Sequence, residues 1–320
     1  MTRVLVTGAN GFVGSALCER LTAQGTGVRA VIRTGSSSRN RSPSVQVAGV
    51  DGIHAGTDWS VALAGVTHVV HLAARVHVMQ EVARDPLAAF RVVNTAGTVN
   101  LARQAVAAGV RRFVYVSTIK VNGERTSGRP FRADDNPQPE DAYAQSKLEA
   151  EILLKETGHY SGIEVVIVRP PLVYGPGVKG NFLSMLRVLR RGWPLPLASC
   201  SNRRSLVGLT NLVSLLEKCV THPAAAGQVF LAADGEDLST PELLSRVAHA
   251  LGRKARLLPF PPAMLRLATR IAGREGIYER LCGSLQIDTG KTHELLGWAP
   301  PLSVDEELAR TARWFLASNR

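Results

Sequence analysis

The chain contains little cysteine, and the four cysteines present form no pattern. Its 320 residues carry only Cys18, Cys200, Cys219 and Cys282, with no CxxC pair and no histidine at metal-ligand spacing. Zinc sites and disulfide-rich frameworks show regular cysteine spacing. We therefore expect four free thiols, buried or incidental, with neither a disulfide nor a bound metal.

Long apolar stretches and a leader-like start are also missing. No apolar run approaches the roughly 18–20 residues of a membrane span, and the opening MTRVLVTGANG enters a strand pattern without the regions of a signal peptide. These absences predict a cytoplasmic protein. The stretch MLRLATRIAGR, with Arg266, Arg270 and Arg274, has an apolar face that we assign to the core, so membrane contact is not expected.

A compact basic tract is absent as well, although the net charge is +12. A basic surface can attract nucleic acid, anionic substrates or a membrane face. The arginines here are dispersed singly and in pairs, without interleaved aromatic residues. We therefore expect no nucleic-acid partner, and the charge reflects either an anionic substrate or a bias of the whole proteome.

Short apolar runs alternate with amphipathic segments along the first two thirds of the chain. Continuous apolar strands separated by helices are typical of a parallel sheet covered on both faces. The pattern predicts an α/β fold with a Rossmann-type, doubly wound parallel sheet. The expected strands are residues 3–7, 28–32, 69–72, 113–117, 164–168 and 228–232, and the expected helices are 86–109, 141–157 and 209–220.

The amino-acid composition changes near Pro170, where RPPLVYGPG is rich in proline and glycine. Further on, short helices at 240–251 and 262–273 are joined by proline-rich segments such as LLPFPP. We assign residues 1–174 to a dinucleotide-binding domain, to which 206–233 return. Residues 175–205 and 234–320 form a smaller substrate-binding domain.

The segment TGANGFVG, residues 7–14, lies between the first strand and the first helix. Its three glycines permit a tight turn and close approach to a pyrophosphate at the helix N-terminus. The later strand end HLAA places small side chains where a cofactor would lie. The cofactor-binding residues expected from these two segments are Gly8, Asn10, Gly11, Phe12, Val13, Gly14, Leu72, Ala73 and Ala74.

A hydroxyl, a phenol and an amine stand at a spacing that suits proton transfer. Tyr143 and Lys147 are four residues apart on one helix face, and Ser117 and Thr118 end the strand FVYVS. A lysine ammonium and an oxidised nicotinamide would both favour the phenolate of a tyrosine, which otherwise titrates near 10. Tyr143 could then exchange a proton with an alcohol during hydride transfer, with Thr118 bonded to the same oxygen.

These motifs occur in a familiar order: the glycine loop, HLAA, N-x-x-G-T from Asn94, VST-x-x-V-x-G and Y-x-x-x-K. Together they resemble the extended short-chain dehydrogenase/reductases, in particular the nucleotide-sugar epimerase and reductase branch. RPPLVYGPG, RRSLV and the C-terminal LGWAPP segment are similar to that family too, so the resemblance covers nearly the whole chain.

The resemblance implies roles for individual residues. Thr118, Tyr143 and Lys147 would be catalytic, with Asn94 supporting the lysine through the helix backbone or water. Ser117, Pro170, Tyr143 and Lys147 would also contact the cofactor. The residues expected to hold a UDP-sugar are Lys120, Asn181 and Arg204, although Asn181 could instead cap a helix and Arg204 could be a solvated loop arginine. Relatives commonly dimerise through helices corresponding to 95–109 and 141–157, so a homodimer is expected.

Two departures from the family pattern narrow the reaction. Ile119 and Lys120 stand where the related 4,6-dehydratases carry an Asp-Glu pair, which argues against water loss, and Asn122 replaces a usual tyrosine. STIKVNGE resembles bacterial enzymes that act on N-acetylated UDP-sugars for surface polysaccharides. Our first interpretation is a 4-ketoreductase of a UDP-2-acetamido-2,6-dideoxy-hexos-4-ulose. The alternatives are a UDP-glucose or UDP-N-acetylglucosamine 4-epimerase with tightly bound NAD, a reductase of a non-nucleotide ketone and, more remotely, a non-catalytic dinucleotide-binding protein.

Arg33 ends the second expected strand, in VIRTGSSSR. NAD-selective folds carry Asp or Glu there, which binds the ribose 2′-hydroxyl. Arg33 can instead pair with a 2′-phosphate, helped by Thr34, Ser36, Ser37 or Arg39. We therefore expect NADP(H) to be favoured, with NAD(H) as the alternative.

Overall fold

The computed structural model describes residues 2–37, 44–76, 85–271, 273 and 275–318. Seven parallel strands form its main sheet, in the order β3-β2-β1-β4-β5-β6-β9. The doubly wound α/β fold predicted from the sequence is confirmed. The strands are β1 (Arg3–Thr7), β2 (Gly27–Arg33), β3 (Val45–Val50), β4 (His68–His71), β5 (Arg112–Val116), β6 (Glu164–Arg169) and β9 (Val229–Leu231).

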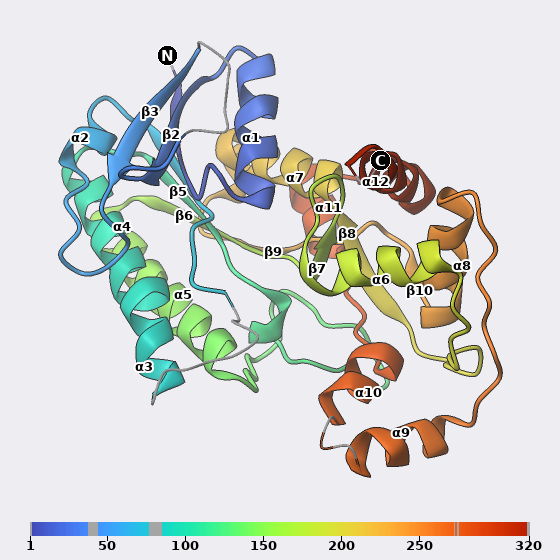
Figure 1. Cartoon of the computed structure of the whole chain (residues 1–320). Helices are drawn as coiled ribbons and strands as arrows, with labels where there is room; N and C mark the ends of the chain where they lie inside the picture. The colour runs from blue at the N-terminus through green and yellow to red at the C-terminus, as the bar shows by residue number, and fades with distance from the viewer. Residues whose placement is uncertain (1, 38–43, 77–84, 272, 274, 319–320) are drawn as a thin grey trace.

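Helices cover both faces of this sheet (Figure 1). Because side chains alternate along a strand, Val4 and Val6 of β1 enter one core while Leu5 enters the other. The first core lies under α1 (Phe12–Ala23) and α7 (Leu209–Thr221), which contact each other. The second lies under α2 (Ser60–Leu63), α4 (Thr98–Ala107) and α5 (Ala142–Ser161).

Two details of the sheet region differ from the sequence prediction. Strand β3 was not expected, because VQVAGV is an edge strand with glycine, alanine and glutamine that has no continuous apolar run. The expected helix 86–109 is divided into α3 (Pro86–Phe90), a π-helical segment η1 (Arg91–Gly97) and α4. Asp85 caps α3 by accepting a hydrogen bond from Ala88 N.

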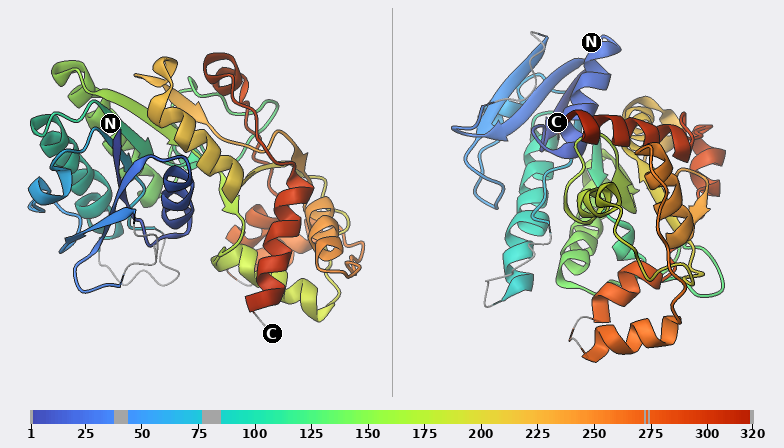
Figure 2. Two further views of the ribbon diagram at one scale, coloured as in Figure 1. Left: turned by 90° about the horizontal axis from the view of Figure 1, so that it is seen from above. Right: turned by 45° about the vertical axis from the view of Figure 1, so that its right-hand side comes forward.

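A second lobe lies beside the sheet (Figures 1 and 2). Its small sheet has the order β10-β8-β7 and was not predicted. Its strands are β7 (Leu172–Tyr174), β8 (Arg204–Gly208) and β10 (Asp237–Leu238), and β7 and β10 have only three and two residues. The remaining elements are η2 (Ile119–Val121), α6 (Gly180–Arg191), η3 (Pro223–Ala225), α8 (Thr240–Ala250), α9 (Pro262–Ile271), α10 (Glu275–Cys282), α11 (Gly290–Leu296) and α12 (Val304–Ser318).

The chain crosses between the lobes more than once. β9 returns to the main sheet beside β6, as the sequence indicated for 228–232. β7 and β8, whose sequences flank α6, pair with each other in the small sheet. The division at 174, 206 and 234 remains a prediction.

Helix α9 does not place its whole apolar face in the core. Leu265 packs partly against the core of the second lobe, but the side chains of Met264, Leu267 and Ile271 are 55%, 57% and 79% exposed. The assignment of this segment to the core is therefore wrong for these three residues. Within the described part of the chain, no helix combines the length and apolarity that crossing a membrane requires.

The cysteine prediction is half correct. Cys18 and Cys219 are buried free thiols, but Cys200 and Cys282 form a disulfide with their Cα atoms 5.5 Å apart. The two residues are 82 positions apart in the chain, so no local spacing could signal that the end of α10 meets the loop after α6. Among the described residues, no group of three or more His, Cys, Asp or Glu side chains could hold a metal ion.

Candidate active site

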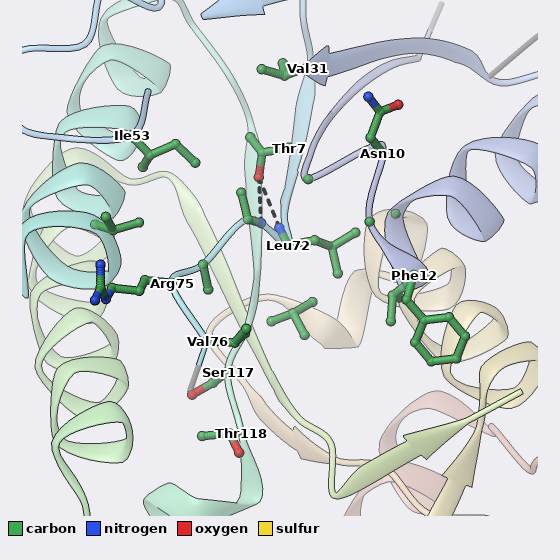
Figure 3. A pocket seen from close by; sticks show the side chains of 18 of the residues that line it. Thr7, Asn10, Phe12, Val31, Ile53, Leu72, Arg75, Val76, Ser117 and Thr118 are labelled. Atoms are coloured by element: carbon green, nitrogen blue, oxygen red, sulfur yellow. Dashed lines mark hydrogen bonds between the residues drawn. The ribbon is translucent and has the colours of Figure 1, made fainter. Parts of the chain in front are cut away.

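A cleft of about 790 Å³ opens at the carboxyl ends of the central strands. Doubly wound sheets bind their ligands at this edge. Figure 3 shows Thr7, Asn10, Phe12 and Leu72 on one side, with Ser117 and Thr118 below them. All the expected cofactor residues line the cleft: Gly8, Asn10, Gly11, Phe12, Val13, Gly14, Arg33, Leu72, Ala73, Ala74, Ser117, Tyr143, Lys147 and Pro170.

The three glycines of the loop stand where a side chain would not fit. Gly8 has φ +67°, and a Cβ there would lie 3.0 Å from Ala73 N. A Cβ at Gly14 would lie 2.1 Å from Gly8 O, and one at Gly11 would lie 2.9 Å from the same oxygen. The backbone therefore lies bare at the N-terminus of α1, whose first turn has no acidic residue. This arrangement fits a pyrophosphate.

A buried network holds the chain that faces the glycine loop. The Thr7 hydroxyl accepts hydrogen bonds from Leu72 N and Ala73 N, both at 3.1 Å (Figure 3). The same hydroxyl can then donate its one hydrogen bond to His71 Nδ1, 2.7 Å away. The other ring nitrogen, Nε2, then carries the histidine proton and donates to Thr98 Oγ1 at 3.0 Å. Burial, with a smaller contribution from Lys147, lowers the His71 pKa to about 3, so the ring is neutral.

Thr118, Tyr143 and Lys147 all line the cleft, as the spacing predicted. Lys147 Nζ donates to Val116 O at 2.8 Å and lies 4.0 Å from the centre of the Tyr115 ring. Burial lowers the Lys147 pKa to about 7. Burial, with a smaller contribution from Asp141, raises the Tyr143 pKa to about 12.

These directions oppose the effect expected from the sequence. The spacing of Tyr143 and Lys147 brings an ammonium near the phenol but says nothing of burial, which disfavours both charged forms. A positively charged nicotinamide bound in the cleft would stabilise the phenolate. In the absence of a cofactor, the protein therefore favours the protonated form of Tyr143.

Asn94 does not line the cleft. It contacts Ser146, the residue that precedes Lys147. Its Nδ2 donates to Ser146 Oγ at 3.0 Å and to Arg75 O at 3.0 Å, while its Oδ1 accepts from Arg75 N at 2.8 Å. Thr95 Oγ1 also donates to Ser146 O. Asn94 thus ties the segment after β4 to α5, beside the lysine that it was expected to support.

Ser117 is buried, and its Oγ has no hydrogen-bond partner within the described structure. A buried hydroxyl without a partner is costly, and this one stands on the floor of the cleft, where a bound dinucleotide could satisfy it. Together with the bare glycine loop, this orphaned group indicates that the cleft fits a dinucleotide.

Comparison with known proteins identifies the class to which this architecture belongs. The model of the NAD dependent epimerase/dehydratase family matches residues 4–233. The chain belongs to that family. A UDP-glucose 4-epimerase of Vibrio cholerae is 46% identical over 319 residues, covering 99% of this chain and 96% of that protein. A UDP-glucose 4-epimerase of Mycolicibacterium smegmatis is 30% identical and covers 98% of both chains.

Solved structures of the family share the fold. The UDP-glucuronic acid 4-epimerase from Bacillus cereus, in complex with NAD, superimposes with a TM-score of 0.81 over 100% of both chains at 21% identity. The family and these relatives establish an NAD-dependent enzyme of the extended short-chain dehydrogenase/reductase type that belongs to the nucleotide-sugar branch.

The three residues expected to hold the sugar nucleotide are not part of the cleft lining. Lys120 Nζ pairs with Glu124 and Asp141, each at 2.7 Å. Asn181 is exposed in the first turn of α6. Arg204 Nη1 donates to the carbonyl oxygens of Glu279, Arg280 and Gly283 near the end of α10. Their contact with substrate remains a prediction.

The cleft is also lined by residues that the sequence did not predict. Val31 of β2 and Ile53, after β3, line the cleft opposite the glycine loop (Figure 3). Val50 and Gly52 lie on the same wall, which was overlooked because β3 itself was not predicted. Arg33 lines the rim and is exposed, and Asn10 Nδ2 donates to Ser37 O at 3.0 Å. Arg39, proposed as a further phosphate donor, lies outside the described residues.

Asn122, one of the two departures from the family pattern noted in the sequence, is buried at the C-cap of η2. Its Oδ1 accepts from Arg169 Nη1 at 2.9 Å and its Nδ2 donates to Arg132 O at 2.9 Å. It therefore joins β6 to the segment after η2. This departure has a structural role in the chain, away from the cleft.

Proposed function

We propose that the protein is a UDP-sugar 4-epimerase acting on UDP-glucose or UDP-N-acetylglucosamine, with NAD held in the cleft. The observation that carries this proposal is the 46% identity to a UDP-glucose 4-epimerase, which extends over 99% of the chain. It favours the epimerase alternative over the 4-ketoreductase that the local sequence suggested first.

The chain's own groups supply proton transfer and positioning. Bound NAD would accept a hydride from sugar C4 and later return it. Tyr143 takes the proton of the C4 hydroxyl as the alcohol is oxidised and gives it back when the ketone is reduced on its other face. Thr118 donates a hydrogen bond to the same oxygen. Lys147, held by Val116 O, lies four residues beyond Tyr143 on α5 and supplies positive charge to the lining of the cleft when protonated.

The test is product analysis with a matched variant. Purified protein is incubated separately with UDP-glucose and UDP-N-acetylglucosamine, and the C4 epimers are resolved by proton NMR. We expect one epimer pair to interconvert without a stoichiometric reductant. Tyr143→Phe should lower turnover by roughly 10²–10⁴-fold, the usual contribution of a positioned acid–base group. Absence of interconversion with both sugars would contradict the proposal.

Arg33 favours a second candidate, the 4-ketoreductase of a UDP-2-acetamido-2,6-dideoxy-hexos-4-ulose. A reductase must exchange its cofactor at every turnover, and an arginine at the rim of the cleft suits NADPH. Incubation of the protein with the product of a 4,6-dehydratase and NADPH separates the two. Consumption of NADPH with loss of the 4-keto signal would support the reductase.

We also propose that the protein forms a homodimer through η1, α4 and α5. A shallow hollow on these elements is lined by residues including Arg91, Val92, Thr95 and Leu153. Val92 is 52% exposed, and Ile152 on α5 is 49% exposed. Light scattering tests the assembly: a dimeric mass is expected for wild type and a monomeric mass for Val92→Glu. A monomeric wild type would exclude it.

A further inference from the structure

Lys120 is held between two carboxylates directly behind the catalytic threonine. It belongs to η2, whose N-cap is Thr118. Its Nζ donates to Glu124 Oε1 and Asp141 Oδ2, each at 2.7 Å. The ammonium is therefore already used by the protein, which differs from the substrate contact expected from the sequence.

Asp141 has a second task at the same time. It is the N-cap of α5, and its Oδ1 accepts a hydrogen bond from Ala144 N at 2.6 Å. One carboxylate oxygen thus starts the helix that carries Tyr143 and Lys147, while the other oxygen is bound to Lys120. The ion pair joins the segment behind Thr118 to the first turn of α5.

The charge of Asp141 acts on Tyr143, which lies two residues further along. A carboxylate at this position opposes formation of a phenolate, and it contributes to the raised Tyr143 pKa after burial. Further charged or titratable groups lie on the elements packed here. Lys147 Nζ on α5 lies over the Tyr115 ring of β5, and Lys120 of η2 also pairs with Glu124. The Arg75 guanidinium lies over the Phe90 ring, which meets Tyr143 edge-on. Lys120 is the cation bonded directly to Asp141.

We propose that Lys120 is a positioning residue whose ion pair with Asp141 fixes the start of α5 against η2 and offsets the negative charge in front of Tyr143. The proposal depends on the proposed function in one respect, namely that Tyr143 transfers the proton. It assigns a task to the lysine that stands where related dehydratases carry a carboxylate.

The first experiment follows the pH dependence of kcat/KM for UDP-sugar interconversion. Lys120→Met leaves Asp141 uncompensated, so the acidic limb, where Tyr143 loses its proton, should move upward by on the order of 0.5–1 pH unit. Asp141→Asn keeps a good helix cap but removes the charge, so the limb should move downward. The double variant should return close to wild type, and Lys120→Arg should retain the wild-type limb.

Arg246→Met is the matched control. Arg246 also bridges two carboxylates, Glu236 and Asp305, but it lies on α8 in the second lobe. Loss of the Arg246 guanidinium should leave the acidic limb of the kcat/KM profile unchanged. An unchanged limb in Lys120→Met, or a rise in KM alone that Asp141→Asn does not reverse, would overturn the proposal and favour direct substrate binding by Lys120.

A second readout does not require turnover. Tyrosine labelled with ¹³C at Cζ is titrated by NMR with NAD⁺ bound, and the Tyr143 resonance is assigned from Tyr143→Phe. The same opposite displacements in Lys120→Met and Asp141→Asn are expected. If no UDP-sugar reacts while these displacements occur, the proposed function fails and the role of Lys120 stands. Identical titrations in all variants would refute that role.

Discussion

Arg169 Nη2 and Glu151 Oε2 lie 2.5 Å apart in an ion pair that is almost completely buried, with side-chain exposures of 2% and 1%. Arg169 Nε donates to the second carboxylate oxygen at 3.0 Å, and Asn122 accepts from Nη1. The pair links β6 to α5, one turn beyond Lys147. It therefore fixes the helix that carries Tyr143 and Lys147.

Removing one partner should strongly destabilise the protein. Glu151→Gln leaves the Arg169 guanidinium buried without its counter-charge, and breaking such a pair costs about 3–5 kcal/mol. Urea unfolding measures the loss. Glu217→Gln, which breaks the more exposed pair between Arg20 and Glu217, is the control and should change stability little. Similar losses in the two variants would contradict the assignment.

The sequence predicted the parts of this site that depend on local spacing. Gly8 and Gly14 follow a strand and start a helix, and Tyr143 and Lys147 share one helix face, so their meeting in the cleft needed only a doubly wound fold. The wall of the cleft at Val50 and Ile53 was not predicted because edge strand β3 is weakly patterned. The Cys200–Cys282 disulfide and the partners of Lys120 escaped it because they depend on tertiary packing between elements that are distant in the chain.

His71 should make folding stability depend on pH. Its folded pKa of about 3 lies below the ordinary value of 6.5, so the folded state binds fewer protons than the unfolded state once the pH falls below 6.5. Stability is then fully present above pH 6.5 and is lost as the pH falls, by up to about 1.4 kcal/mol per pH unit from this group. Protonation of His71 Nδ1 would also remove the acceptor of the hydrogen bond that the Thr7 hydroxyl donates.

The measurement compares urea unfolding of wild type and His71→Gln between pH 4 and pH 8. The variant should be less stable at neutral pH, because the bonds to Thr7 and Thr98 are weakened. The difference in unfolding free energy between wild type and His71→Gln should narrow toward pH 4. Parallel stability curves would show that His71 does not contribute to the acid sensitivity.

Arg204 is expected to contact the diphosphate of a UDP-sugar, although its Nη1 is bonded to carbonyls at the end of α10. A guanidinium has five donors, so Nη2 and Nε can still serve an anion. Arg204→Ala should weaken binding of UDP by about 1.5–3 kcal/mol, the usual contribution of a hydrogen bond to a charged group. Isothermal titration of UDP decides the matter, with Arg203→Ala as the control. Equal affinity in Arg204→Ala and wild type would leave Arg204 with a purely structural role in tying β8 to α10.

Arg33 tests the choice of cofactor. It lies at the end of β2 on the rim of the cleft, where NAD-selective folds carry an acid that binds the ribose 2′-hydroxyl. The family and the 46% identical epimerase point to NAD(H), whereas the guanidinium could pair with a 2′-phosphate.

Direct titration of NAD⁺ and NADP⁺ on wild type and Arg33→Asp separates these contributions without requiring turnover. If Arg33 contacts the phosphate, the substitution should weaken NADP⁺ by on the order of tenfold or more, because it removes a charge-assisted bond and adds repulsion. NAD⁺ should be unaffected or should bind more tightly. Equal affinities for both dinucleotides in both proteins would place the Arg33 side chain away from the ribose, and the sequence argument for a reductase would then lose its basis.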